Sequence, residues 1–322
     1  GHLLAAPLKC HHSDGICIVI KRDRFFTPPH PMKSWILAAR PKTLPAAIVP
    51  VWAGCVLAWK LQGSWQPWLA FCTVMGAICI QIATNFFNDA IDAAKGADTA
   101  KRQGPTRVTA SGLISRRAVF TAATIFLLLA VACGVVLYQA VGWPILAIGI
   151  PSLYLAYGYT GGPFPLAYRG MGEIFVVAFF GIIAVGGTVL VQTGQWRDEA
   201  MLLGFQIGLL SAVLISINNL RDRAEDATTG KNTMAVRLGE LGARFLIWLE
   251  IKVAAFSGLI WLKHQLPWLG LATIPLWTLG LYLSFRIFTS PADRSMNRLL
   301  ALSGVMLILF AAAFHIAAVV FE

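Results

Sequence analysis

Residues 66–92 read QPWLAFCTVMGAICIQIATNFFNDAID, an apolar run that ends in a cluster of Asn and Asp residues. A hydrocarbon layer of ~30 Å requires about 20 helical residues at ~1.5 Å each, so this run predicts a helix that crosses a membrane. The whole chain has only 15 Asp and Glu among its 322 residues. A cluster of carboxylates at the end of a membrane helix therefore indicates a functional site at the bilayer surface.

The composition of the rest of the chain is that of a membrane protein. Hydrophobic residues make up 57% of the sequence and charged residues 13%, which leaves too few polar side chains for a water-exposed surface. Backbone groups must be paired within lipid, and no barrel-like alternation is present, so the expected fold is all-α, a polytopic helical bundle. We expect nine apolar spans, at residues 43–60, 66–88, 117–138, 143–160, 172–192, 200–220, 244–262, 268–288 and 299–320.

Basic residues predict the orientation of these spans. With a cytoplasmic N-terminus, four loops face the cytoplasm, at residues 89–116, 161–171, 221–244 and 286–298. Only a few basic residues then lie elsewhere: Lys60, Arg197 and Lys263 on the opposite side, and Lys252 within a span. This distribution follows the positive-inside rule, so the net charge of +11 indicates membrane topology and not nucleic acid binding.

The first 31 residues differ in character from the rest. They contain Pro, His and basic residues, and their apolar part at 16–20 is too short for the core of a signal peptide. We expect residues 1–31 to be an extension outside the fold and residues 32–322 to form one membrane domain.

A second polar cluster follows the sixth span, where residues 218–226 read NNLRDRAED. In the first cluster Asn88 and Asp92 are four residues apart, and in the second Asn218, Asp222 and Asp226 keep the same spacing. Residues at i and i+4 share one face of a helix. Each helix end is therefore expected to present several oxygen ligands to a common cavity between two similar halves of the bundle.

Oxygen ligands at this spacing favour Mg²⁺, which binds one or two carboxylates together with substrate phosphates. No HExxH or CxxC pattern indicates zinc, and no P-loop or GxGxxG motif could cradle a phosphate. Phosphate would then be held by the metal and by nearby basic side chains. The candidates are Lys95, Lys101, Arg102, Arg107, Arg221 and Lys231.

Several segments together resemble the UbiA superfamily of intramembrane aromatic prenyltransferases, and within it the naphthoate branch. They are RPKTLP at 40–45, NDAIDAAKGAD at 88–98, RQGPTR at 102–107, YTGGPFPLAYRGMGE at 159–173 and NNLRDRAEDATTGKNTMAVRLG at 218–239. The family's first motif is commonly NDxxDxxxD, whereas Gly96 stands here at the third acidic position and Asp98 follows it. The second motif, commonly DxxxDxxxD, begins here with Asn218. Both departures are typical of the naphthoate branch.

The resemblance implies a Mg²⁺-dependent reaction in a bacterial cytoplasmic membrane, with the active site facing the cytoplasm. A polyprenyl chain would pass from a polyprenyl diphosphate to 1,4-dihydroxy-2-naphthoate, with loss of CO₂ and diphosphate, to give demethylmenaquinone. Two Mg²⁺ ions would be held by Asn88, Asp92, Asn218, Asp222 and Asp226. Roles in catalysis are implied for Asp92, Asp222, Asp226, Lys95 and Arg102, and roles in substrate binding for Lys42, Arg107, Arg221, Lys231 and Tyr159.

Two other readings stay open from the sequence. A prenyltransferase acting on 4-hydroxybenzoate or homogentisate would share the fold and the motifs. A membrane transporter would also place carboxylates in helices, but near the midplane and not at helix ends next to basic loops.

Overall fold

The computed structural model describes residues 31–96, 104 and 107–321. All regular structure in this part of the chain is helical, which confirms the expected all-α class. The helices, in chain order, are α1 (Pro31–Ala39), η1 (Pro41–Thr43), α2 (Pro45–Gln62), α3 (Pro67–Ala94), α4 (Arg116–Val141), α5 (Pro144–Gly158), η2 (Leu166–Tyr168), α6 (Gly172–Val176), η3 (Val177–Ile183), α7 (Ala184–Thr193), α8 (Asp198–Thr228), α9 (Met234–Phe256), η4 (Ser257–Leu262), η5 (Pro267–Thr273), α10 (Ile274–Thr289) and α11 (Met296–Val320).

Eight helices of the described chain are long and apolar enough to cross a membrane. Three of them are composite, because α6, η3 and α7 run on as one rod, as do α9 with η4 and η5 with α10. The span expected at 143–160 corresponds to α5, which is apolar but has only 15 residues. Such a helix rises ~22 Å, less than the ~30 Å of a hydrocarbon core. The expected count of nine spans is therefore not confirmed.

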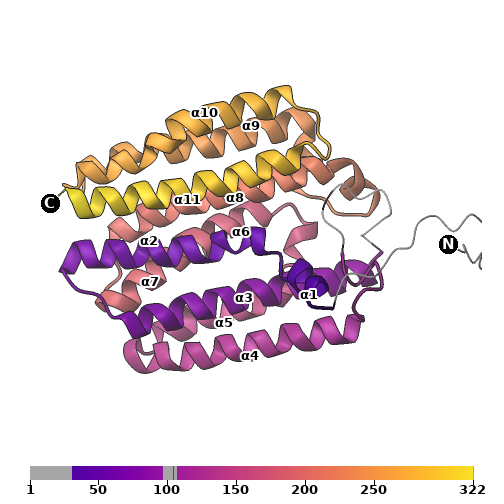
Figure 1. The fold of residues 1–322 in the computed structure, drawn as a ribbon, viewed down its shortest axis with the longest axis horizontal. Helices are drawn as coiled ribbons and strands as arrows, with labels where there is room; N and C mark the ends of the chain where they lie inside the picture. The colour runs from indigo at the N-terminus through magenta and orange to yellow at the C-terminus, as the bar shows by residue number, and fades with distance from the viewer. Residues whose placement is uncertain (1–30, 97–103, 105–106, 322) are drawn as a thin grey trace, which may run out of the picture.

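The long helices run side by side along the long axis of the molecule (Figure 1). Helices α8 to α11 form one half of the bundle, α3 to α5 form the other, and α2 and α7 lie between them. The C-terminal ends of α3 and α8 reach the same end of the bundle, where α1 also lies. This end, called the acidic end below, carries both polar clusters.

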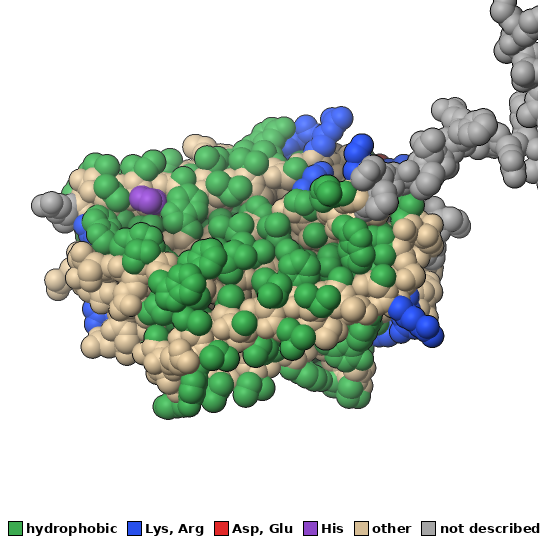
Figure 2. All heavy atoms as spheres, turned by 60° about the horizontal axis from the view of Figure 1, so that its bottom comes forward, with side chains coloured by type: hydrophobic (Ala, Val, Ile, Leu, Met, Phe, Trp, Pro, Cys, Tyr) green, Lys and Arg blue, Asp and Glu red, His purple; other side chains and the backbone are tan. Residues whose placement is uncertain are grey.

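The lateral surface is apolar. Figure 2 shows one side of the bundle covered mainly by hydrophobic side chains, with Lys and Arg near the two ends and no acidic side chain in view. Such a surface matches a hydrocarbon environment, as the lengths of the helices require.

Helix α8 is the central element of the bundle. In its most apolar stretch of 18 residues, 78% is buried inside the bundle, against 17% for the corresponding stretch of α4 on the outside. Close packing against η3 depends on glycines, because a Cβ atom added to Gly208 would lie 2.6 Å from the backbone oxygen of Val177. Small residues at such crossings let two membrane helices approach closely. The position of α8, and with it the second cluster, therefore depends on this contact.

Replacing Gly208 with Ala is expected to destabilise the protein by about 1–3 kcal/mol, because the added methyl group would push η3 away from α8. The measurement is the midpoint of thermal unfolding in detergent. Gly134→Ala on α4 is the matched control, since a Cβ atom there would meet nothing within 4 Å. Equal midpoints for the two variants would contradict the tight packing described here.

Candidate active site

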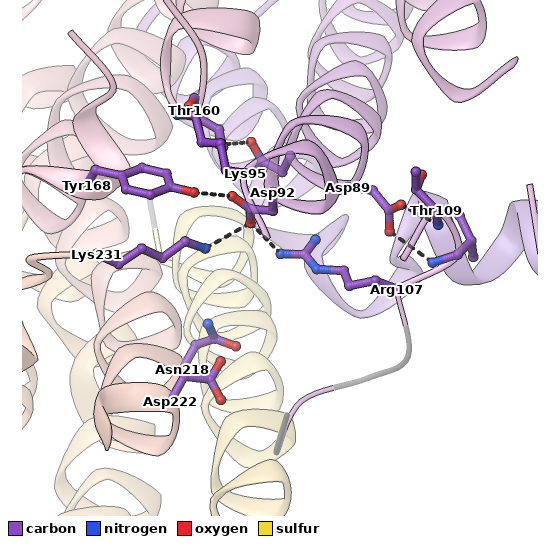
Figure 3. Close-up of polar contacts among 12 residues, drawn as sticks. Asp89, Asp92, Lys95, Arg107, Thr109, Thr160, Tyr168, Asn218, Asp222 and Lys231 are labelled. Carbon is purple, nitrogen blue, oxygen red and sulfur yellow. Dashed lines mark hydrogen bonds and ion pairs between the residues drawn. The ribbon is translucent and has the colours of Figure 1, made fainter. Parts of the chain in front are cut away.

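Asp92 is the centre of the first cluster (Figure 3). Its side chain is 3% exposed, and three groups from other segments donate to its oxygens. Oδ2 accepts from Nη2 of Arg107 and from Nζ of Lys231, both at 2.9 Å. Oδ1 accepts from the hydroxyl of Tyr168 at 2.9 Å. Two cations thus lie against this buried carboxylate, and their attraction offsets the cost of burying it.

The neighbouring polar residues of α3 divide between two tasks. Asn88 faces the site, and its Oδ1 accepts from the hydroxyl of Thr160. Asp89 points away from Asp92 and holds the chain before α4, because its two carboxylate oxygens accept from the backbone N–H groups of Val108 and Thr109 at 3.2 and 2.8 Å. Only part of the first motif therefore faces the space shared with the second cluster.

The second cluster lies on the last turns of α8. Asp222 is 6% exposed and forms a two-point ion pair with the guanidinium of Arg221, at 2.8 and 2.6 Å. Arg221 also donates to Oδ1 of Asn218 at 2.7 Å. Asp226 is 8% exposed, and its backbone oxygen accepts from the N–H of Lys231 at 3.0 Å. The turn that brings Lys231 onto Asp92 thus starts from the second cluster and joins the two.

Two lysines flank the ring of Tyr168. Nζ of Lys95 lies 4.1 Å from the ring centroid and Nζ of Lys231 lies 5.2 Å from it. Lys95 also donates to the backbone oxygen of Thr160 at 2.8 Å. Burial lowers the pKa of Lys95, the Asp92 carboxylate raises that pKa, and the charge of Lys231 lowers it. The acidic end therefore gathers positive charge around its carboxylates, which suits an anionic ligand.

The segment between α1 and α2 is attached to α3 through the hydroxyl of Thr43. This hydroxyl donates to the backbone oxygen of Arg40 at 2.9 Å and accepts from the side-chain amides of Gln81 and Asn85, both at 3.1 Å. Arg40 has a left-handed backbone with φ of 52°. The bond from Thr43 spans this turn and holds the segment against the bundle.

A cavity of about 380 Å³ lies within the bundle. Its wall is almost entirely apolar and is formed mainly by α2, α3, α4, α5, η3 and α7, with contributions from η2 and α6. The wall includes Tyr159, which is adjacent in the chain to Thr160 of the site. Burial raises the pKa of the Tyr159 hydroxyl, and the carboxylates of Glu173, Asp92 and Asp226 raise it further, so the hydroxyl stays protonated.

The sequence-predicted site residues are not all placed together. One contact network, connected through Thr160 and Tyr168, contains Asn88, Asp92, Lys95, Arg107 and Lys231. A second group is formed where Arg221 joins Asn218 and Asp222. Lys42 is exposed. Asp98, Lys101 and Arg102 lie outside the described residues.

Three contacting residues were not among the expected ones. Tyr168 and Thr160 contact the first cluster, and Asn297 on α11 accepts from Arg221. Tyr168 and Thr160 belong to the stretch at 159–173 that carried the family resemblance, but nothing in their spacing assigned them a role. Nothing in the sequence indicated a role for Asn297, because it lies far along the chain at the start of an ordinary helix.

The donor atoms of the two clusters suit a hard cation. Asn88, Asp92, Asn218, Asp222 and Asp226 offer only oxygen, the atom type that Mg²⁺ prefers. Within the described residues no three Asp, Glu, His or Cys side chains are grouped closely enough to hold a metal alone. The residues fit a cation whose remaining ligands come from amide oxygens and from a substrate.

The chain belongs to the UbiA prenyltransferase family, whose model matches residues 47–319. Its membrane-spanning helices make it a multi-pass membrane protein. This result confirms the resemblance carried by the motifs and removes the transporter reading.

Curated relatives point in the same direction. Over 257 residues the chain is 37% identical to a 1,4-dihydroxy-2-naphthoate octaprenyltransferase of Escherichia coli (strain K12), and the match covers 76% of this chain and 82% of that protein. A protein of the same description from Mycobacterium tuberculosis is 37% identical over 245 residues, covering 75% and 82%. Among solved structures, a UbiA homolog from Archaeoglobus fulgidus bound to DMAPP and Mg²⁺ shares the fold at a TM-score of 0.62 and 15% identity, covering 90% of this chain and 100% of that one.

Tyr168→Phe is expected to lower the rate of prenyl transfer about 10-fold, because a hydrogen bond to a buried charged group is lost. Tyr168→Leu is expected to lower it further, since the ring between Lys95 and Lys231 is lost as well. The measurement is the steady-state rate of both variants with saturating donor. Equal rates for Phe and Leu would show that the ring contributes nothing.

Proposed function

We propose that the protein transfers a polyprenyl chain from a polyprenyl diphosphate to 1,4-dihydroxy-2-naphthoate. Diphosphate leaves with the electron pair of the allylic C–O bond, the ring forms the new C–C bond, and the ring carboxylate departs as CO₂. The product is demethylmenaquinone, formed first in its reduced state. The observation that supports the proposal is the placement of two oxygen clusters and several basic side chains at one end of the bundle, together with an apolar cavity whose wall includes Tyr159.

The acidic end suits a diphosphate and a divalent metal ion. We expect two Mg²⁺ ions, held by Asn88 and Asp92 from α3 and by Asn218, Asp222 and Asp226 from α8. The metal, when bound, would neutralise charge on the leaving diphosphate. Lys95, Arg107 and Lys231 already lie around Asp92 and would add N–H donors to the same oxygens. Substrate binding by Lys42 and a catalytic role of Arg102 stay predictions from the sequence.

The cavity suits the isoprenoid chain. Its wall is apolar along α3, α4, α5 and α7 and includes Tyr159, the chain neighbour of Thr160 in the site. A chain lying there would place its allylic carbon beside the clusters. Water would quench an allylic cation, so a reacting carbon at the mouth of a membrane-embedded cavity is protected from a side reaction.

The orientation of the acidic end follows from charge. The loops that join α3 to α4, α8 to α9 and α10 to α11 all lie there. The ranges 89–116, 221–244 and 286–298, which include these loops and the helix turns beside them, hold 13 of the 26 Lys and Arg residues of the chain, whereas the loops of the opposite side hold Lys60, Arg197 and Lys263. By the positive-inside rule this end faces the cytoplasm, in a bacterial inner membrane, where a water-soluble acceptor and a diphosphate are available.

The deciding experiment offers purified protein in detergent a polyprenyl diphosphate with either 1,4-dihydroxy-2-naphthoate or 4-hydroxybenzoate. We expect demethylmenaquinone and CO₂ from the naphthoate alone, and a loss of at least about 100-fold with EDTA or in Asp222→Ala, since removing one oriented charge-stabilising group typically costs that much. Product from 4-hydroxybenzoate alone would keep the chemistry but assign a different acceptor.

Gly134→Phe tests the place of the isoprenoid chain. Gly134 lies on the cavity wall with open space around it, so a phenyl ring there would fill part of the cavity. We expect kcat/KM for a long donor to fall about 10-fold or more, and that for geranyl diphosphate to change little, because only the long chain needs the deeper wall. Leu128→Phe, on an exposed face of the same helix, is the control. An equal loss for both donors would place the chain elsewhere.

A further inference from the structure

Arg221 has almost no hydrogen-bonding capacity left for a ligand. Nε and Nη2 bind the two oxygens of Asp222, and Nη2 also binds Asn218. Nη1 donates to Oδ1 of Asn297 at 2.7 Å. A guanidinium has five N–H groups, so these four bonds leave one. The side chain is 1% exposed, which removes it from any approaching anion.

The geometry of the Arg221–Asp222 pair requires a support from outside α8. Consecutive residues on a helix point in different directions and do not face each other. The guanidinium therefore reaches Asp222 only by folding back along the helix, and the fourth bond, to Asn297, holds it in that position.

Asn297 is well placed to act as this support because the start of α11 is fixed. Oδ1 of Asp293 accepts from the N–H of Ser295 at 2.7 Å, and its backbone oxygen accepts from the N–H of Met296 at 3.0 Å. Met296 is fully buried, and α11 packs along α8. The amide of Asn297 is thus carried on a rigid first turn against the second cluster.

We propose that Arg221 and Asn297 are positioning residues for a divalent cation, and that Arg221 does not bind the diphosphate. Arg221 fixes the oxygens of Asn218 and Asp222 in the arrangement that receives the cation, and Asn297 holds Arg221. That the cation serves prenyl transfer rests on the proposed function, but the positioning role of the two residues does not. Diphosphate binding then falls to Lys95, Arg107 and Lys231, which surround the other cluster.

The test is Mn²⁺ binding to purified protein without substrates, followed by the EPR signal of free Mn²⁺. Asn297→Ala leaves every charge in place and removes the oxygen that accepts from Nη1 of Arg221, and we expect the dissociation constant for Mn²⁺ to rise about 10-fold, the usual effect of losing a residue that orients a metal ligand. Asn297→Asp keeps an oxygen for Nη1 and is expected to restore binding to within about twofold. Arg298→Gln, on the exposed neighbouring position, is the control.

Arg221→Lys provides a second, independent variant should Asn297→Ala fail to fold. Lysine keeps the charge but cannot bridge Asp222, Asn218 and Asn297 together, so the same loss of Mn²⁺ affinity is expected. The double variant should bind Mn²⁺ no more weakly than Arg221→Lys alone, because Asn297 acts only through Arg221.

Unchanged Mn²⁺ affinity in Asn297→Ala and Arg221→Lys, with a raised KM for the polyprenyl diphosphate at saturating Mg²⁺, would overturn the proposal and return Arg221 to diphosphate binding. The Mn²⁺ measurement needs no turnover. A wild-type protein that binds Mn²⁺ but does not prenylate the naphthoate would therefore contradict the proposed function and leave the positioning role standing.

Discussion

A carboxylate taken out of water loses its hydration, which donors of the protein must replace, and the acidic end is arranged around that constraint. Asp92, Asp89 and Asp222 are each nearly inaccessible, and each has both oxygens engaged. Removing a partner from such a buried pair typically costs about 3–5 kcal/mol, far more than an exposed pair contributes. The partners are therefore as much a part of the site as the carboxylates.

Satisfying Asp92 also connects distant parts of the chain. Its donors come from the segment before α4, from η2 and from the turn after α8. One side chain on α3 thus joins both halves of the bundle at the acidic end. Asp222 does the same on a smaller scale, since Arg221 links it to α11. The charge that suits an anionic ligand and the contacts that hold the helices together are provided by the same residues.

The sequence predicted the helix ends better than the contacts between them. Hydropathy and the four-residue spacing were enough to place Asn88 and Asp92 on one helix end and Asp222 on another. Hydropathy could not show that α5 ends after 15 residues, because the break at Tyr159 depends on local turn geometry. Nor could it show that Arg221 turns inward, since adjacency in sequence says little about side-chain direction. Asn297 became visible only once α11 was packed against α8.

The hydroxyl of Thr43 has a consequence for how this segment can vary between relatives. It gives its one hydrogen to Arg40 and both lone pairs to Gln81 and Asn85, so its bonding capacity is full. Serine alone among the other amino acids offers the same three bonds from the same place. Valine, which has the same shape as threonine, would leave two buried amide donors without an acceptor at once. Substitution at this position is therefore limited by the number of hydrogen bonds that the side chain can form and not by its size. Related chains that keep Gln81 and Asn85 should carry only Thr or Ser here.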